Sequence, residues 1–471
     1  MGQRPKDEIS IYEHFIDRAF IADSERKINR AGYIGVRTRL YPYVEQLAFA
    51  MMVSQRMDVS IDELAISVNN DETIVERLIG LSLITQSENG DLTFIHNSFK
   101  EFILAKKLST LPFDKIKALV CYPETEILIP TLRNVVVLLI RILSDKSNWQ
   151  VSDFKEWFIC KHPDVLVEVG PECLDAKIRE SVFEDIFNDH KRKGVHIDFW
   201  GSRKLMQFSS TSSSVLFILK ELEEMTSWDV NCMNALKLAE YADFSLISDK
   251  DCSRAKDIFL SMLRLDNLSI EDYGYVTLPF NNKSIISSDF LEQTLSVVGD
   301  TQNCYLIKMV CSMAISLSLS DNYASWVLTK AKFVHDYYEN GVNHVISDHE
   351  LLEFVRSLRN PEHVLNFLDY FLSDKKYSEE TLFASERTEL IPDLLNVLKL
   401  YRSDSLVRRL ISIIDNCDFD KISLKVNTAL RLYFETVTDV NALFGQRLEN
   451  IIEYMHTDSP DYFVQGQCAG S

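Results

Sequence analysis

The apolar residues of this chain recur mostly at the spacing of an α-helix. The first helical face is formed by Tyr12, Phe15, Ile16, Ala19 and Phe20. A polar stretch over 23–30 follows it, and Gly32 and Gly35 are expected to break the chain there. Residues 1–40 are therefore predicted to form a helical lead-in.

After this lead-in the pattern changes to short helices followed by one hairpin. Ser60 and Glu63 have the spacing of a capping box, in which each side chain bonds the backbone near the other residue. Another helix is expected over 71–79, and Asn89-Gly90 then separates two β-prone runs, which is a strong hairpin signal. Three helices and then a hairpin is the order of a winged helix, which we predict over 41–111.

Beyond Pro112 the pattern predicts helices and little else. Adjacent helices with short polar links favour a helical solenoid, although no fixed period identifies a repeat class. The spacings Ser98–Glu101 and Ser347–Glu350 predict two more capping boxes, and 274–286 is expected to form a loop or a small hairpin. The predicted fold class is mainly α, with a small winged-helix domain followed by an α-helical repeat (solenoid-like) arm over 112–471.

The composition agrees with long helices. The 471 residues include only 14 Gly and 11 Pro, whereas 46% are hydrophobic. None of the nine Cys forms a C-x-x-C pair, which favours reduced thiols and a cytoplasmic location. The apolar runs at 135–140 and 309–317 are shorter than the roughly 18 residues of a membrane span, so they are predicted to be core helices.

The charge argues against nucleic acid as a partner. The formal net charge is −20, and such a chain repels phosphate unless a local patch concentrates positive charge. The helix over 71–79, which would read DNA in a regulator, carries three acids against Arg77. We therefore expect this helix to pack against protein. The basic run 191–193 is expected to be a solvated loop.

The motifs that carry most enzyme chemistry are missing from the sequence. It contains no G-x-x-x-x-G-K-S/T, G-x-S-x-G, H-E-x-x-H or EF-hand loop, and its ten His show no metal-ligand spacing. Asp164 and Glu168 resemble the start of a nuclease site, but the Lys expected two residues later is absent. His196 and Asp198 are interpreted as a surface pair. We expect no catalytic residue, no metal site and no cofactor within this chain.

The most informative stretch is 92–105. Its fixed positions are Phe94, His96, Ser98, Phe99, Glu101 and Phe102. It closely resembles the F-x-H-x-S-F-Q-E-F/Y-x-x-A signature of NACHT-type STAND NTPases, which closes the winged-helix domain behind the ATPase core. Lys100 stands where that family has Gln, at a position expected on the solvent side of the helix start. The resemblance covers about residues 9–110.

The resemblance implies a role for several of these residues. In the family the signature His contacts the β-phosphate of bound ADP and helps to hold the resting state. By position this residue is His96, which would sense nucleotide only with an ATPase core present, and ADP or ATP would then be the cofactor. Phe94, Phe99 and Phe102 are interpreted as core.

The resemblance also implies a biological role. The chain would be the regulatory and sensor portion of a signalling protein in antiphage or innate-type defence. Its arm would bind a protein ligand, and its winged helix would relay this to an NTPase domain in cis or in trans. The activated form would be a homo-oligomer, and neither nucleic acid nor a membrane is expected as a partner.

The absence of an ATPase core leaves several alternatives open. The chain would be the C-terminal part of a longer STAND protein, the product of a split gene, or a degenerate relative. A winged-helix transcription regulator with a helical ligand domain is another interpretation, and a plain α-helical scaffold protein is a third.

We predict that the full chain binds no defined DNA duplex specifically, because its third helix is acidic. Fluorescence anisotropy with labelled duplexes at physiological salt measures this directly. Nanomolar affinity for one sequence, which is typical of specific DNA readers, would show that the helix over 71–79 has been misinterpreted.

Overall fold

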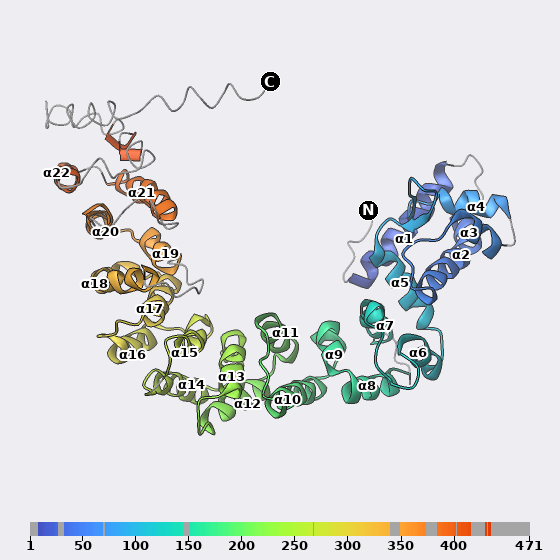
Figure 1. Cartoon of the computed structure of the whole chain (residues 1–471), viewed down its shortest axis with the longest axis horizontal. Coiled ribbons are helices and arrows are strands. Elements are labelled where there is room, and N and C mark those ends of the chain that lie inside the picture. Colours follow the sequence, from blue (N-terminus) through green and yellow to red (C-terminus); the bar gives the residue numbers. More distant parts are fainter. Residues whose placement is uncertain are drawn as a thin grey trace. The chain divides into compact units, whose positions relative to one another are not determined.

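The computed structural model describes most of the chain as helix (Figure 1). The residues described are 8–26, 33–68, 71–144, 150–266, 268–339, 349–373, 384–401, 403–415, 429–430 and 432–434. Among them the only sheet has two strands, which confirms the mainly α fold class. The chain divides into two compact units, Met1–Ser214 and Val215–Ser471.

The first unit begins with helices, continues through the hairpin and then returns to helices. Its elements are α1 (Glu8–Arg26), α2 (Tyr33–Val53), α3 (Ile61–Ser67), α4 (Glu72–Ile79), β1 (Ile84–Gln86), β2 (Leu92–Phe94), α5 (Asn97–Leu108), α6 (Phe113–Val120), α7 (Arg133–Ser144), α8 (Gln150–Lys161), α9 (Pro163–Val169), α10 (Ala176–Lys193) and α11 (Phe199–Ser209), with short 3-10 turns at Pro130–Leu132 and Pro171–Cys173.

The predicted chain break at Gly35 is wrong. Gly35 does not break the chain, because α2 runs through it and through Pro42 without interruption. Leu40, Val44 and Leu47 of this helix are buried in the core. Burial of this face therefore outweighs the cost of Gly35 in the first turn and of Pro42 in the helix interior.

The short elements after α2 follow the predicted order. Ser60 and Glu63 form the predicted capping box at the start of α3, with both bonds present. Strands β1 and β2 pair antiparallel in the register Ile84 with Phe94, and Gly90 in the turn takes the left-handed φ of +89°. Val59 pairs with Leu92 through two backbone hydrogen bonds of 3.0 and 2.8 Å, which adds a one-residue edge to the hairpin.

One continuous hydrophobic core runs through the first unit. Helix α5 lies within it, in contact with α1, α2, α7 and β2. Helix α7 contains the predicted core run 135–140, and all of these residues are buried. The predicted boundary between residues 40 and 41 falls inside α2, and that between 111 and 112 falls within this core. The division into lead-in, winged helix and arm stays a prediction.

The second unit is a series of helices. Its elements are α12 (Ser212–Glu223, which begins in the first unit), α13 (Val230–Tyr241), α14 (Asp249–Met262), α15 (Asp272–Val276), α16 (Ser288–Val298), α17 (Cys304–Ser316), α18 (Ser320–Glu339), α19 (His349–Ser357), α20 (Pro361–Ser373), α21 (Ala384–Leu398) and α22 (Asp404–Asp415), with 3-10 turns at Phe244–Leu246 and, as η4, at Leu278–Asn281.

Helices of the second unit pack against the helix two places along the chain as well as against their sequence neighbours. Helix α17 contacts α19, which contacts α21, and α18 contacts α20, which contacts α22. Alternate helices therefore form two layers. The helices α18, α20 and α22, each preceded by a described residue, begin at Ser320, Pro361 and Asp404.

The stretch 274–286 contains no hairpin: it begins with the end of α15 and the turn η4, and residues 282–286 form a non-helical turn. Helix α15 leads into the turn η4, and the buried Asn282 that follows donates to the backbone oxygens of Ala239 and Ala242 at 2.8 and 2.6 Å. This amide satisfies carbonyls at the C-terminal end of α13 and so fixes a segment that lacks a long apolar stripe. The predicted capping box at Ser347 lies outside the described residues.

We predict that Phe102→Ala destabilises the first unit by about 3–5 kcal/mol, because Phe102 is fully buried in α5 and its removal leaves a cavity. Phe15→Ala is the matched control, since Phe15 is 55% exposed and should cost only about 1 kcal/mol. Hydrogen exchange of peptides from α1 and α5 measures both. Equal effects of the two variants would contradict this view of the core.

Candidate functional site

His96 occupies the junction between strand β2 and helix α5. Its backbone is extended, and it is the N-cap residue of α5: its Nδ1 accepts a hydrogen bond from the backbone N–H of Ser98 at 3.2 Å. The Ser98 hydroxyl lies 2.6 Å from the same nitrogen. The predicted capping box between Ser98 and Glu101 is therefore wrong, because His96 caps the helix and Ser98 lies in its first turn.

This cap determines which way the imidazole presents its other nitrogen. A backbone N–H can only donate, so Nδ1 must offer its lone pair, and the neutral ring then carries its proton on Nε2. His96 is exposed, and within the described residues Nε2 makes no hydrogen bond. An imidazole held in this way presents one N–H donor outward, as contact with a phosphate oxygen requires.

Four aromatic rings from α1 and α5 pack beside His96. Tyr12 stacks on Phe102 with centroids 5.1 Å apart, and Phe15 stacks on Phe99 at 5.2 Å. The edge of this cluster meets the His96 ring, whose centroid lies 6.5 Å from that of Phe99. Phe94, Phe99 and Phe102 are buried, which confirms their interpretation as core.

The same cluster leaves apolar side chains at the surface. Ile11 and Phe15, one turn apart on α1, are 51% and 55% exposed, and Ile95 beside His96 is also exposed. We call Ile11, Phe15, Ile95 and His96 the α1–α5 face. Exposed apolar patches of this kind mark interaction sites more often than single exposed hydrophobics do.

Lys100 and Glu101 are both buried. The position of Lys100 on the solvent side was therefore predicted wrongly: it is only 9% exposed, and its Nζ lies 3.5 Å from the sulfur of Met57. Burial lowers the pKa of Lys100. Burial also raises the pKa of Glu101, against the opposing effect of hydrogen bonding, and its carboxylate accepts from the Asn97 side chain at 2.7 Å.

Three cations of the region 41–111 are paired with acidic side chains. Arg56 pairs with Glu63 at 2.7 Å, Lys106 with Glu13 at 2.6 Å and Lys107 with Glu45 at 3.1 Å. A surface that reads DNA needs cations that can reach phosphates. These three pairs reduce the number of cations that can reach phosphates, although Arg77 of α4 forms no ion pair in the described part of the chain.

Asp164 and Glu168 have a structural role. They lie one turn apart on α9 and both accept from Arg133 of α7, at 2.7 and 3.0 Å. Asp198 is the N-cap of α11 and accepts from the backbone N–H of Gly201. Asp164, Glu168 and Asp198 thus stabilise helices by accepting hydrogen bonds.

The basic run 191–193 is the last turn of α10, not a loop. Arg192 and Lys193 pair with Asp189 on the same helix at 3.2 and 2.5 Å. Cations in the last turn also interact favourably with the helix dipole. These contacts stabilise the end of α10.

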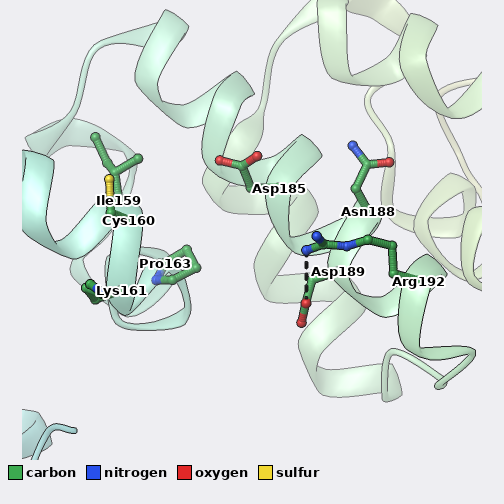
Figure 2. Close-up of a pocket in the computed structure, with 8 residues that line it drawn as sticks. All are labelled: Ile159, Cys160, Lys161, Pro163, Asp185, Asn188, Asp189 and Arg192. Carbon is green, nitrogen blue, oxygen red and sulfur yellow. Dashed lines mark hydrogen bonds and ion pairs between the residues drawn. The ribbon is translucent and has the colours of Figure 1, made fainter. Parts of the chain in front are cut away.

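An open cleft of about 600 Å³ lies between the end of α8, the start of α9, and α10. Figure 2 shows Ile159, Cys160, Lys161 and Pro163 on one side and a stripe of α10 side chains on the other. The α10 stripe consists of Asp185, Asn188, Asp189 and Arg192. The pKa of Asp189 is lowered, chiefly by its hydrogen bond with Lys193. The cleft balances two cations against two acids, and Asp189 already pairs with Arg192 and Lys193, so the cleft lacks the features of an acid–base centre.

Four described cysteines are buried, namely Cys121, Cys232, Cys304 and Cys311, whereas Cys160 is exposed. Burial raises the pKa of the Cys232 thiol to about 12, and the described cysteines are free thiols. In the described part of the chain no group of three or more His, Cys, Asp or Glu side chains is placed to hold a metal ion. Nor is any described helix both long and apolar enough to cross a membrane.

Comparison with protein families, with curated proteins and with solved structures found no match to this chain. The functional proposals therefore depend on the geometry of the α1–α5 face and of the surfaces around α10 and α11.

Sequence reasoning missed the surface around Trp200. Trp200 on α11 is 76% exposed, the most exposed aromatic side chain among those described, and Phe199 beside it is 49% exposed. The sequence signal was the pair Phe199-Trp200, followed four residues later by Arg203-Lys204, which places two aromatics and two cations on adjacent turns.

We predict that Glu101→Gln flattens the pH dependence of stability. Because the folded-state pKa of Glu101 is raised, the folded chain binds more protons than the unfolded chain between the ordinary and the raised pKa, and stability falls as pH rises through that window. Glutamine can still accept from Asn97 without a buried charge. Urea unfolding from about pH 4 to about pH 8 should show a shallower fall and equal or greater stability at neutral pH. A less stable variant with an unchanged slope would contradict this.

Proposed function

We propose that this chain is the regulatory and sensor portion of a NACHT-type STAND signalling protein. In this proposal 41–111 is the winged-helix domain, 1–40 is its helical lead-in and 112–471 is a helical-repeat sensor arm. The order of α2, the paired Val59, α3, α4, β1 and β2 supports the winged helix. The two-layer packing of α17 to α22 supports the repeat arm.

The observation that carries the proposal is the orientation of His96. Its Nδ1 is committed to the helix cap, so its Nε2–H is available to a ligand on the exposed side. The exposed Ile11 and Phe15 border it, so a docked domain would bury apolar area around the same point. A docked nucleotide-binding domain with ADP at its edge would offer a phosphate oxygen to this N–H and an apolar surface to these side chains.

The arm would take a protein ligand, and the winged helix would pass the signal to the NTPase domain, in cis or in trans. ADP would hold the resting state, and exchange for ATP would release the chain for homo-oligomerisation. Free buried thiols support a cytoplasmic location. The output would be antiphage or innate-type defence.

A winged-helix transcription regulator is the second candidate, and the pairing of Arg56, Lys106 and Lys107 with acids disfavours it. A plain helical scaffold is the third. A scaffold would give no reason for an exposed imidazole donor bordered by apolar side chains, and it would not respond to nucleotide.

Two substitutions at His96 separate its capping and nucleotide-sensing roles. With an NTPase core supplied, His96→Asn should lower ADP retention roughly ten- to a hundredfold, because a hydrogen bond to a charged group contributes about 1.5–3 kcal/mol. Asparagine is a good N-cap, so the melting temperature should stay close to that of the parent. His96→Ala should lose both the ADP contact and about 1 kcal/mol of stability.

Labelled ADP release and thermal unfolding are the two measurements. If His96→Asn retains ADP like the parent, the assignment of nucleotide sensing to His96 is wrong. If only His96→Ala has an effect, and only on unfolding, the residue is a helix cap and nothing more.

A further inference from the structure

The junction of α10 and α11 concentrates positive charge on an acidic chain. Over 189–204 there are five cationic side chains against Asp189 and Asp198, a balance of 5 − 2 = +3, whereas the whole chain carries −20. Asp189 pairs with Arg192 and Lys193, and Asp198 is occupied as the cap of α11. Neither acid therefore faces the cations of α11 as a partner.

The exposed face of α11 combines these cations with aromatic rings. Trp200, Arg203 and Lys204 follow the i, i+3, i+4 spacing of one helix face, and all three are exposed, as is Phe199. Arg203 and Lys204 form no ion pair among the described residues, unlike Arg192 and Lys193. We call Phe199, Trp200, Arg203 and Lys204 the α11 face.

Several aromatic rings of the α12–α22 region lie in the core. Phe244, Phe259, Phe280 and Phe290 form a buried chain of ring contacts, in which Phe280 stacks on Phe290 at 5.2 Å. Trp200, by contrast, is 76% exposed, more than any other aromatic side chain among those described. Trp and Arg are also the residues most enriched among those that dominate binding energy at protein interfaces.

We propose that the α11 face binds a short acidic peptide segment of a partner protein that carries an apolar anchor side chain. The anchor would pack on Trp200 and Phe199, and carboxylates on either side would pair with Arg203 and Lys204. As a ligand contact of the sensor arm this surface rests on the function proposed above. In the isolated chain, to which no NTPase core has been added, peptide binding does not require nucleotide or His96.

The charges around the face favour a peptide over a nucleic acid strand. Glu184, Asp185 and Asp189 lie along α10 beyond the basic run. A nucleic acid strand carries one charge at each nucleotide, so any strand longer than a few nucleotides would pass these acids. A peptide can place neutral residues there. At physiological salt, charges more than about 8 Å away are largely screened, so a short segment senses mainly the local cations.

The test uses the full chain and a short fluorescein-labelled peptide of glutamates around one leucine, followed by anisotropy. The double variant R203E/K204E and the single variant Trp200→Ala should each weaken binding at least tenfold, and raised salt should weaken binding to the parent. The matched control is K115E/K177E, which makes the same charge change at two exposed lysines on α6 and α10 that form no ion pair in the described chain. This control should change affinity by less than about twofold, since it alters only long-range charge.

Three further probes decide the class of ligand: the peptide with glutamine for glutamate, an oligothymidylate, and phosphatidylserine vesicles. The glutamine peptide should bind at least tenfold more weakly. Tighter binding of the oligothymidylate or the vesicles than of the acidic peptide would overturn the proposal, as would equal peptide binding by parent and α11-face variants. Circular dichroism confirms that each variant is folded. His96→Asn should leave peptide binding unchanged, so a failure here and a failure of the nucleotide role are distinguishable.

Discussion

Helix α5 is buried over almost its whole circumference, and the organisation of the first unit follows from this. Residues Phe99 to Ala105 and Leu108 are all buried, against α1, α2, α7 and β2. A helix that is enclosed on every side must be surrounded by other elements, since its apolar surface has no other way to leave water. The same enclosure buries Lys100 and Glu101 and shifts both of their pKa values. It also places His96, the residue at which α5 begins, at a rigid point on the surface.

Sequence signals predicted the elements that depend on local interactions. The Ser60–Glu63 capping box and the hairpin around Gly90 each depend on bonds within a few residues, and each is found where the pattern placed it. Two of the errors occurred where tertiary contacts dominate. Helix α2 continues through Gly35 because its apolar face is buried, and Asn282 fixes the α15 segment by bonds to residues about forty positions earlier.

The candidate site was predictable in part. The position of His96 followed from the signature. The capping role followed from neither the signature nor the Ser98–Glu101 spacing, because it depends on the rotation of one imidazole toward the backbone of Ser98. The α11 face could not be recognised from sequence alone, since a Trp at helical spacing more often lies in a core. Recognising it as a binding surface requires the exposed fraction of each side chain and the identity of the cations that have acidic partners. Both are properties of the folded chain.

The central claim is that the α1–α5 face docks a nucleotide-binding domain, and site-specific photocrosslinking tests it most directly. A photoreactive amino acid at Phe15 should crosslink, in the native cell, to a segment carrying a phosphate-binding loop, and added ADP should increase the yield. The same probe at Ile66, an exposed apolar residue on α3 outside this face, should not crosslink to that segment. Equal crosslinking from both positions, or crosslinks from Phe15 only to proteins without a phosphate-binding loop, would contradict the account.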